Sequence, residues 1–434
     1  MRFGLAACTL VSLLGVACGH ASDPEPRGVR IVLVTLDTLR ADALPSMPKL
    51  ASRAASARRF TNAFASSPAT QPSHASLFTG LAPWEHGVSR NGLVLAEARL
   101  TLAERLADAG FATAAVVASF PLHPRFGFAQ GFDVFVHRFG RRLGGETWKG
   151  AAVAGRFYQT AGPVTEDALR LLREASGVKQ FFWFHYFDPH EPYGDTVGEG
   201  MPLGVLAATR RDAPERLPAR IEAAHRLYGR DVAHLDRQLD RVFQQLEVDA
   251  ARFETHVLVT ADHGESFGED GALGHGARLT REQVQVPLLV WSPDVTAGVD
   301  AAPASSVDVA RTLLARAGVD PRGFGGRDLG GPAPREGARA TGMRVTGLGP
   351  LDLLLAGLPP DASRAPRFFL ADGTRLYAGD GHALFEEDDP ARPVRDDPLR
   401  ARFAGFAAAL ARTAAVERLD PETREGLRAL GYGE

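Results

Sequence analysis

The stretch IVLVTLD, residues 31–37, is a continuous apolar run that ends in an acid. A run of this kind suits a parallel strand that is buried on both faces of a sheet. Similar runs occur at 111–119, 180–188, 255–262 and 286–291. Their even spacing leaves room for a helix between most of them, which is the pattern of an α/β domain.

Helical patterns fill the gaps between these runs. In LTLAERLADAG, Leu102 and Leu106 share one face, and Gly110 supplies the stop signal. Helices are predicted over 100–110, 164–176 and 219–246. The expected fold is therefore an α/β domain with a mostly parallel sheet flanked by helices, over residues 30–334.

The pattern changes at about residue 335. The stretch RFFLADGTRLYAGDGHALFEE, residues 367–387, reads as short strands joined by Asp-Gly turns, which favour hairpins. A helix rich in alanine and leucine follows. Residues 335–434 are predicted to form a smaller C-terminal α+β subdomain.

The first 18 residues, MRFGLAACTLVSLLGVAC, combine one positive charge with an apolar run too short to span a bilayer. They predict a signal peptide that ends in a lipobox, with Cys18 as the lipidated residue. Residues 19–29 form a polar linker. We expect a periplasmic or extracellular lipoprotein anchored at Cys18, with plain secretion as the alternative.

Composition narrows the class of protein. The 434 residues are 45% hydrophobic and 23% charged, as in an ordinary globular protein. The net charge of −3 gives no basic surface for nucleic acid. Cys8 and Cys18 are the only cysteines, and both lie in the leader. The body of the chain therefore has no cysteine nucleophile, disulfide or cysteine zinc site.

Two of the apolar runs end in groups that bind metals. Asp37 closes the first run, and Asp262 and His263 close the fourth. Open sheets bind ligands at the carboxyl ends of their strands, so these distant residues are expected to converge. Carboxylates and an imidazole together form a reasonable site for a divalent metal ion.

A polar loop, SSPATQPSHASLFTG at residues 66–80, leads into another helix start. Pro72 fits its first turn and Gly80 fits the position after its end. Thr70 would then lie at the N-terminus, where free N–H groups and the helix dipole attract an anion. Its hydroxyl is a candidate phosphoryl acceptor. The alternative is that Thr70 and Ser73 only cap the helix.

In this order and spacing, LVTLDTLRAD, TQPSHASLFTG and TADHGES resemble the sulfatase family of the alkaline phosphatase superfamily. The resemblance extends over roughly residues 29–434. HYFDPHEPY places His190 where the family has a histidine at the charged group of the substrate. His275, in LGHGARLTREQVQVPLLVW, matches a family lysine or histidine. Asn91 matches a polar residue near the nucleophile of related hydrolases, although a turn-forming role is the alternative.

The departures from the family pattern are informative. The family motif C/S-x-P-S-R supplies a cysteine or serine that becomes formylglycine, whereas this chain reads TQPSH with Thr70 and His74. Threonine cannot become formylglycine. Where many members have two consecutive aspartates, this chain has Asp37 and then Thr38. The resemblance implies one divalent metal held by Asp37, Thr70, Asp262 and His263. Its nitrogen ligand favours manganese or zinc over calcium or magnesium.

These residues lead to a hypothesis about function. Thr70 is the expected nucleophile, supported by His74 and activated by the metal. His190 and His275 are expected to bind the transferred group or protonate the leaving group, and Asn91 to donate a hydrogen bond to it. A hydrogen-bonded loop residue is the alternative for His190. His185 is interpreted as a satisfied strand histidine and Asp236 as structural.

The chemistry of threonine favours phosphate esters over sulfate esters. A sulfated formylglycine hydrate can expel sulfate by collapsing to its aldehyde, but a sulfated threonine has no such exit. A phosphothreonine can be resolved by water or an acceptor alcohol. We therefore expect a hydrolase of small-molecule, glycan or lipid esters, of phosphodiester or phosphonate type. The alternatives are a phosphoryl-group transferase on envelope glycans or lipids, and a non-catalytic binding lipoprotein.

Overall fold

The protein is described by a computed structural model that covers most of the chain. The described residues are 27–138, 146–148, 151–153, 158–332, 339–344, 346, 348–359, 366–372, 375–380 and 382–413. The predicted signal peptide and lipobox at residues 1–18 lie outside this part. Within the described residues, no helix is both long and apolar enough to cross a membrane.

A central sheet of eight strands forms the middle layer of the molecule. Its order is β13 (Gly298–Asp300), β2 (Arg58–Phe60), β12 (Leu288–Trp291), β9 (Phe253–Ala261), β1 (Gly28–Leu36), β8 (Lys179–Tyr186), β4 (Ala112–Val117) and β5 (Val134–His137). Every neighbouring pair is parallel except the two that β12 makes. The sheet is therefore mostly parallel, as predicted, although the apolar run at 286–291 forms an antiparallel strand.

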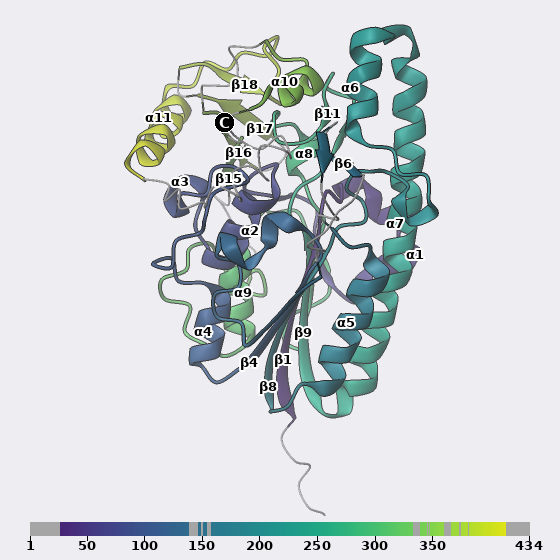
Figure 1. Ribbon diagram of the computed structural model, residues 1–434. Helices are drawn as coiled ribbons and strands as arrows, with labels where there is room; N and C mark the ends of the chain where they lie inside the picture. The colour runs from purple at the N-terminus through teal and green to yellow at the C-terminus, as the bar shows by residue number, and fades with distance from the viewer. Residues whose placement is uncertain are drawn as a thin grey trace, which may run out of the picture.

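Helices cover both faces of this sheet (Figure 1). On one side lie α2 (Thr70–Thr79), α4 (Leu102–Asp108) and α9 (Asp308–Arg316). On the other side lie α1 (Pro48–Ala54), α5 (Ala161–Glu174) and the long α7 (Leu217–Val248). The predicted helix at 100–110 forms α4, which Thr101 and Glu104 start with reciprocal side-chain caps. Burial on both faces explains why the sheet strands are continuously apolar.

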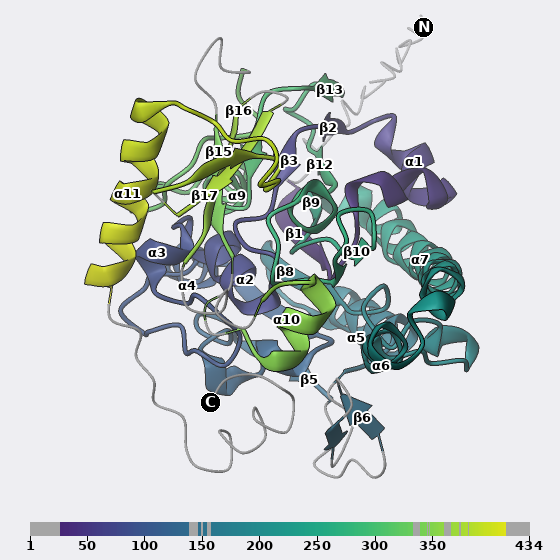
Figure 2. The ribbon, with the colours of Figure 1, turned by 90° about the horizontal axis from the view of Figure 1, so that it is seen from above.

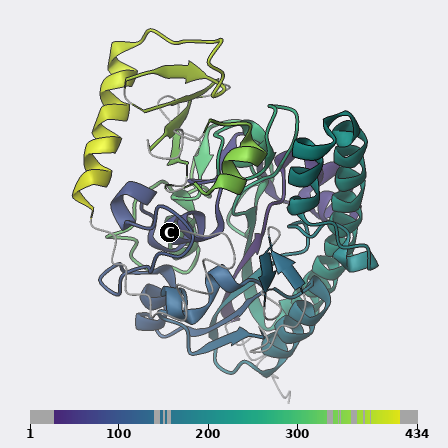
Figure 3. The same ribbon diagram turned by 45° about the horizontal axis from the view of Figure 1, so that its top comes forward.

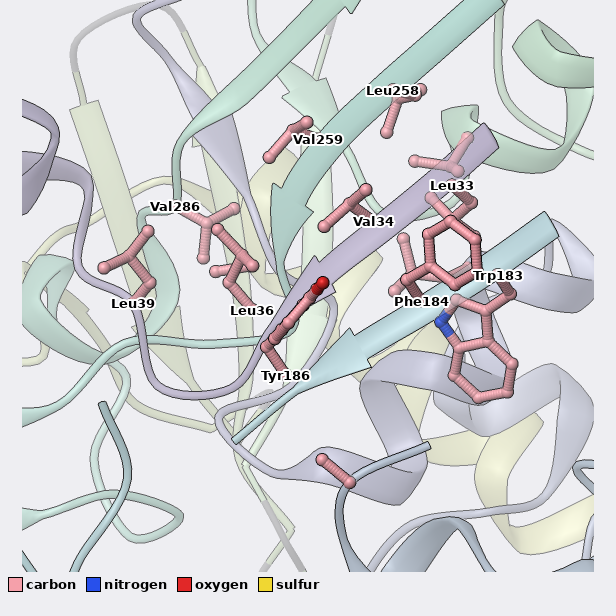
Figure 4. Close-up of a cluster of buried hydrophobic side chains, with 14 of the residues drawn as sticks. Leu33, Val34, Leu36, Leu39, Trp183, Phe184, Tyr186, Leu258, Val259 and Val286 are labelled. Carbon is pink, nitrogen blue, oxygen red and sulfur yellow. The ribbon is translucent and has the colours of Figure 1, made fainter. Parts of the chain in front are cut away.

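The core lies between the three layers, along the central strands. Figure 4 shows Leu33, Val34 and Leu36 of β1 among side chains of β8 and β9. Trp183 of β8 packs edge-on against Phe78 of α2, with ring centroids 4.5 Å apart. This contact seats α2 firmly on the sheet.

A second, antiparallel sheet lies at the C-terminal end of the chain. It consists of β15 (Ala340–Met343), β16 (Phe368–Asp372), β17 (Arg375–Gly379) and β18 (Leu384–Glu386) in that order. The helix α11 (Asp397–Arg412) packs along it, and the unit lies above α2 and α3 (Pro83–His86), as Figures 2 and 3 show. The boundary that we propose, between residues 334 and 335, falls within 333–338, outside the described part.

The remaining elements are short. They are β3 (Ala63–Phe64) with β14 (Ala304–Ser305), β10 (Ser266–Phe267) with β11 (Leu273–Gly274), β6 (Glu146–Trp148) with β7 (Ala151–Val153), α6 (Leu203–Asp212), α8 (Arg281–Val284) and α10 (Pro350–Ala356). α6 lies at the same end of the molecule as the C-terminal sheet (Figure 1).

Candidate active site

Sheet register brings the chemically reactive residues to one edge. β1 pairs with β8 and β9 so that Leu36 lies opposite both Tyr186 and Ala261. Asp37 and Asp262 are the next residues on their strands, at the same level. Because side chains alternate along a strand, Asp37 shares a face with Thr35 and with His185, which pairs with Thr35. That face is the one covered by α2.

Three buried side chains, those of Asp37, Asp262 and His263, converge at this edge. The atoms that they point toward one another make no hydrogen bonds among the described residues. Nε2 of His263 lies 3.6 Å from Oδ1 of Asp37 and 3.6 Å from Oδ2 of Asp262. All three side chains are fully buried, and none of these three atoms has a hydrogen-bond partner among the described residues. Buried polar atoms are normally satisfied, so this trio requires a ligand.

The spacing of the trio suits a shared cation. Ligand atoms about 2.1 Å from a tetrahedral zinc ion lie about 3.4 Å from one another. The observed separations of 3.6 Å are close to this value and too long for hydrogen bonds. Asp37, Asp262 and His263 therefore form a group that could hold a metal ion.

Hydrogen bonds orient two of the three groups for this purpose. Nδ1 of His263 lies 3.0 Å from the carbonyl of Gly264, which can only accept, so the proton is on Nδ1 and the lone pair on Nε2. Oδ1 of Asp262 accepts the backbone N–H groups of His263 and Thr38, which leaves Oδ2 for the cation. Thr38 has a left-handed backbone with φ of 54°, unusual for a threonine.

Burying the two carboxylates of the trio costs free energy when no positive charge lies among them. Burial raises the pKa of Asp37 to about 7 and also raises the pKa of Asp262, to which the nearby Asp37 adds. Burial lowers the pKa of His263, but Asp262 and Asp37 together outweigh it, so that pKa is raised. A protonated His263 lowers the pKa of both carboxylates and so partly meets their demand for positive charge, which a metal ion would also meet.

Thr70 begins α2, the helix whose Ser73 and His74 approach the trio at Asp262. The helix begins at Thr70, Pro72 lies in its first turn, and Gly80 follows its end with φ of 64°, all as predicted. The hydroxyl of Ser73 donates to the carbonyl of Asp262 over 2.6 Å, which ties the helix to the end of β9. Ala69, the residue before the helix, offers no side-chain cap. However, Asn91 accepts the N–H of Gln71, Pro72 has no N–H, and the N–H of Ser73 bonds the carbonyl of Ala69, so these positions do not offer the free donors that were predicted for an anion.

His74 holds the nucleophile segment in place. Its Nδ1 donates to the carbonyl of Thr70 over 2.8 Å. Its Nε2 lies 3.0 Å from the hydroxyl of Thr35, which in turn accepts the indole N–H of Trp183. Burial lowers the pKa of His74 to about 3, so the ring is neutral and Nε2 accepts from Thr35. Both ring nitrogens are occupied, which excludes His74 as a metal ligand.

His185 is a neighbour of the trio that sequence reasoning treated as a satisfied strand histidine. Its Nδ1 accepts the N–H of Ala118 over 3.1 Å, so the proton of the neutral ring is on Nε2. Burial lowers its pKa to about 4, which keeps the ring neutral. Nε2 lies 3.4 Å from Oδ2 of Asp37. His185 therefore presents an N–H to the carboxylate and has no lone pair for a metal.

A second group of histidines lies on the other side of His263. The ring of His275 packs at 4.4 Å from that of His263 and at 5.0 Å from that of His190. Nδ1 of His190 donates to the carbonyl of Glu191 over 2.8 Å. Nδ1 of His275 lies 3.0 Å from Oε1 of Glu265, which is fully buried. In both rings Nδ1 is engaged, so these bonds fix the orientation of the two rings beside His263.

Asn91 lies at the N-terminus of α2, within the predicted site. Its Oδ1 accepts the backbone N–H of Gln71 over 2.9 Å. This bond satisfies one free donor of the helix and leaves the amide N–H groups of Asn91 as donors. The predicted hydrogen bond from Asn91 to a transferred group stays a prediction.

Asp236, interpreted from the sequence as structural, and Arg210 both bind backbone groups of neighbouring segments. Asp236 accepts the backbone N–H groups of Lys49 and Leu50 and so caps α1. Arg210 donates to the carbonyls of Leu354 and Leu355 at the end of α10. The segment 194–225, expected to be a specificity loop, folds largely into α6 and the first turns of α7.

Sequence reasoning missed Glu265 and the role of His185. Glu265 follows His263 by two residues in DHGES, and an acid so close to a predicted metal ligand was a usable signal. No sequence signal gives the proton position of His185, because that depends on the backbone N–H of Ala118 on a neighbouring strand.

Comparisons with known proteins agree with this geometry. A family model described as Sulfatase matches residues 30–319. Choline-sulfatase of Rhizobium meliloti (strain 1021) is 23% identical over 349 residues, 67% of this chain and 67% of that protein. Phosphoethanolamine transferase EptA of Escherichia coli (strain K12) is 34% identical over 67 residues, 15% of this chain and 12% of that protein.

Solved structures share the fold. The phosphonate monoester hydrolase SpPMH from Silicibacter pomeroyi superposes with a TM-score of 0.64 at 20% identity, covering 90% of this chain and 96% of that one. At this level of identity the likeness concerns the architecture.

Proposed function

Because this chain belongs to the sulfatase family, the ester hydrolases of the alkaline phosphatase superfamily, we propose that it hydrolyses phosphate or phosphonate esters through Thr70. The observation that carries the proposal is the trio of Asp37, Asp262 and His263, whose facing atoms lack hydrogen bonds, beside a helix that starts at Thr70. Manganese or zinc is the proposed ion.

Thr70 and His74 are proposed to carry out the attack on the ester, and the pair His190 and His275 the departure of the alcohol. When bound, a divalent ion would supply positive charge for the Thr70 hydroxyl and for an oxygen of the ester. Thr70 Oγ releases its proton to solvent and attacks phosphorus, a new oxygen–phosphorus bond forms, and the bond to the leaving alcohol breaks. His74 holds the backbone of Thr70 for this attack through the carbonyl that it binds.

The histidine pair handles the leaving group and the return step. His275 protonates the departing alkoxide through Nε2, and His190 donates to a non-bridging oxygen. A water then attacks the phosphothreonine and gives its proton to His275, the bond between phosphorus and Thr70 Oγ breaks, and Thr70 regains a proton from solvent. The product is inorganic phosphate from a monoester, a phosphate monoester from a diester, or a phosphonate. Glu265 is a positioning residue that fixes the ring of His275 through Nδ1.

Phosphorus is favoured over sulfur by the chemistry of the nucleophile. Threonine lacks the formylglycine route by which a sulfated enzyme expels sulfate. The match to a phosphoethanolamine transferase over 67 residues supports the same choice, whereas the longer match, over 349 residues, is to a choline-sulfatase. A transferase would pass the same phosphoryl intermediate to an alcohol instead of water.

Hydrolysis of nitrophenyl esters tests the proposal. The substrates are nitrophenyl phosphate, bis-nitrophenyl phosphate, nitrophenyl phenylphosphonate and nitrophenyl sulfate, each with metal-stripped, manganese-loaded and zinc-loaded protein. We expect metal-dependent turnover of one or more phosphorus esters at a higher kcat/KM than that of the sulfate. Faster turnover of the sulfate would contradict the choice of phosphorus. Added ethanolamine or glycerol that diverts product into a new ester would establish transfer.

Removing the charge of Glu265 should slow the hydrolysis of esters with poor leaving groups more than that of esters with good leaving groups. In Glu265→Gln, we expect kcat to fall by about 10²- to 10⁴-fold for phenyl esters. The loss should be smaller for nitrophenyl esters, because they need little protonation to leave. KM should change little.

The control variant is Glu174→Gln, a half-exposed residue at the end of α5. Glu265→Asp should recover part of the rate. An equal loss for all leaving groups would mean that Glu265 acts on the metal site or on folding, and not through His275.

A further inference from the structure

A separate cavity of about 160 Å³ lies between the C-terminal subdomain and the loop that follows His275. Its wall includes three arginines, Arg278, Arg344 and Arg367, and two acids, Asp380 and Asp388. Three guanidinium groups against two carboxylates leave an excess of positive charge among the described residues that line it. A lining of this kind is selective for an anion.

The two acids are engaged within the fold, Asp388 by one of the three cavity arginines and Asp380 by its own turn. Asp388 pairs with Arg367, and its other oxygen accepts the N–H of Leu279 over 3.2 Å. Asp380 accepts the backbone N–H groups of His382 and Ala383 within its own turn. Both carboxylates are therefore already engaged at the wall and shape it, while the guanidinium groups outnumber them.

Arg344 is the most deeply placed of the three arginines. It is 2% exposed and follows directly on β15. Burial, together with the positive charges of Arg367 and Arg278 and against the charge of Asp388, lowers its pKa to about 10. Nε of Arg367 is buried with no hydrogen bond in the described part of the chain. Like charges crowded around one cavity are stabilised by an anion placed among them.

The segments that build this cavity also build the active site. Ala277 and Arg278 follow His275 by two and three residues. Arg344 follows Met343, whose N–H bonds the carbonyl of Ser66 in the loop that leads to Thr70. A ligand group in the cavity would therefore lie beside both catalytic segments.

We propose that this cavity, hereafter the arginine cavity, binds an oxyanion such as a carboxylate or sulfate, carried by the alcohol portion of the substrate. Its volume is several times the roughly 30 Å³ that a water occupies in the liquid, which is enough for one such group. Bidentate contacts from guanidinium groups suit both anions. The substrate class is then an ester whose alcohol carries a second acidic group. This assignment of substrate rests on the proposed function, whereas the binding of an anion does not.

Binding of inorganic sulfate tests the cavity without any turnover. The titration uses metal-stripped Thr70→Ala protein, in which the active site is disabled, at constant ionic strength with chloride as the balancing anion. We expect saturable binding by calorimetry and a matching rise in Tm. Adding Arg344→Met should weaken the affinity on the order of tenfold to a hundredfold.

Controls separate charge from folding. Arg322→Met removes an arginine whose side chain is 89% exposed, and should leave sulfate affinity unchanged. Arg344→Lys should retain part of the affinity. If Arg344→Met fails to fold by circular dichroism, Arg278→Met takes its place. The proposal would be overturned if the protein does not bind sulfate. It would also be overturned if Arg344→Met, or Arg278→Met in its place, binds sulfate as tightly as the protein with the arginine.

Kinetics distinguish a substrate group from a free anion. Glucose 1-phosphate and glucuronate 1-phosphate differ by one carboxylate, and both are offered to the metal-loaded protein with Thr70 intact. We expect Arg344→Met to lower kcat/KM about tenfold or more for the glucuronate ester alone. An equal effect on both esters, with sulfate binding intact, would assign the cavity to a free anion. Turnover of neither ester would count against the proposed function and leave the sulfate result standing.

Discussion

Replacing Thr70 with alanine is expected to lower kcat/KM for phosphate or phosphonate esters by about 10⁴-fold or more, because the group that forms the covalent intermediate is lost. Thr70→Ser keeps a hydroxyl at the start of α2 and should retain measurable turnover. The measurement is steady-state hydrolysis of nitrophenyl esters with saturating manganese or zinc. A burst of nitrophenol from wild type, absent in Thr70→Ala, would show the intermediate directly.

A matched control is available on the same helix. Thr79 is buried, and its hydroxyl bonds the carbonyl of Ala75 one turn before it. Thr79→Ala should lower stability by about 1 kcal/mol and leave kcat within severalfold of wild type. Full activity in Thr70→Ala would mean that water attacks the ester directly and that Thr70 is only a ligand or a cap.

Replacing Asp37 with asparagine is expected to stabilise the metal-free protein while it destroys metal binding. Asp37 is fully buried, neither of its carboxylate oxygens has a hydrogen-bond partner among the described residues, and Asp262 lies close by. A neutral amide relieves the buried charge, and we expect a gain of about 1–3 kcal/mol in the free energy of unfolding near pH 8. The measurement is urea denaturation after removal of metal.

The pH dependence has a definite sign. The folded metal-free protein holds a proton on Asp37 up to about pH 7, whereas the unfolded chain releases it near the ordinary value of 3.8. Between these limits the folded state binds more protons, so its stability falls as the pH rises. Asp37→Asn should make this slope shallower, and the burial of Asp262, whose pKa is also raised, should retain part of it. Asp397→Asn, at an exposed side chain, should leave it unchanged.

Adding metal should reverse the order of stability of wild type and Asp37→Asn. Wild type should gain stability with manganese or zinc as RT ln(1 + [M]/Kd), and Asp37→Asn should gain far less. The variant is then the more stable protein without metal and the less stable one with it. A variant that is destabilised in both conditions would show that Asp37 has a structural role instead.

Most of the α/β framework could be predicted because it depends on local patterns. The apolar run at 31–37 is long enough to predict β1. It ends in a sharp change of polarity, which predicts that Asp37 lies at the end of this strand. The helix start at Thr70 was readable from Pro72 and Gly80 for the same reason. The antiparallel direction of β12 was not, because an apolar run has the same composition in either direction.

The site was only partly predictable, for a physical reason. The residue types of the trio can be read from the sequence. Whether a nearby histidine can bind a metal or only donate a hydrogen bond depends on which ring nitrogen carries the proton, and that depends on partners far along the chain. His185 is fixed by Ala118, and His74 by Thr35 and Trp183. The arginine cavity likewise joins residues from 278 and from 344 to 388, which no sequence spacing brings together.

The position of β1 in the sheet sets the time at which the protein becomes competent to take up its ion. β1 is made first, yet its neighbours are β8 and β9, and Thr38 bonds Asp262 across 224 residues of chain. Neighbouring strands so distant in sequence pair slowly, since a long loop must close first. The emerging polypeptide therefore has no assembled trio, and a metal ion held by the trio would be acquired in the compartment where the chain finishes folding.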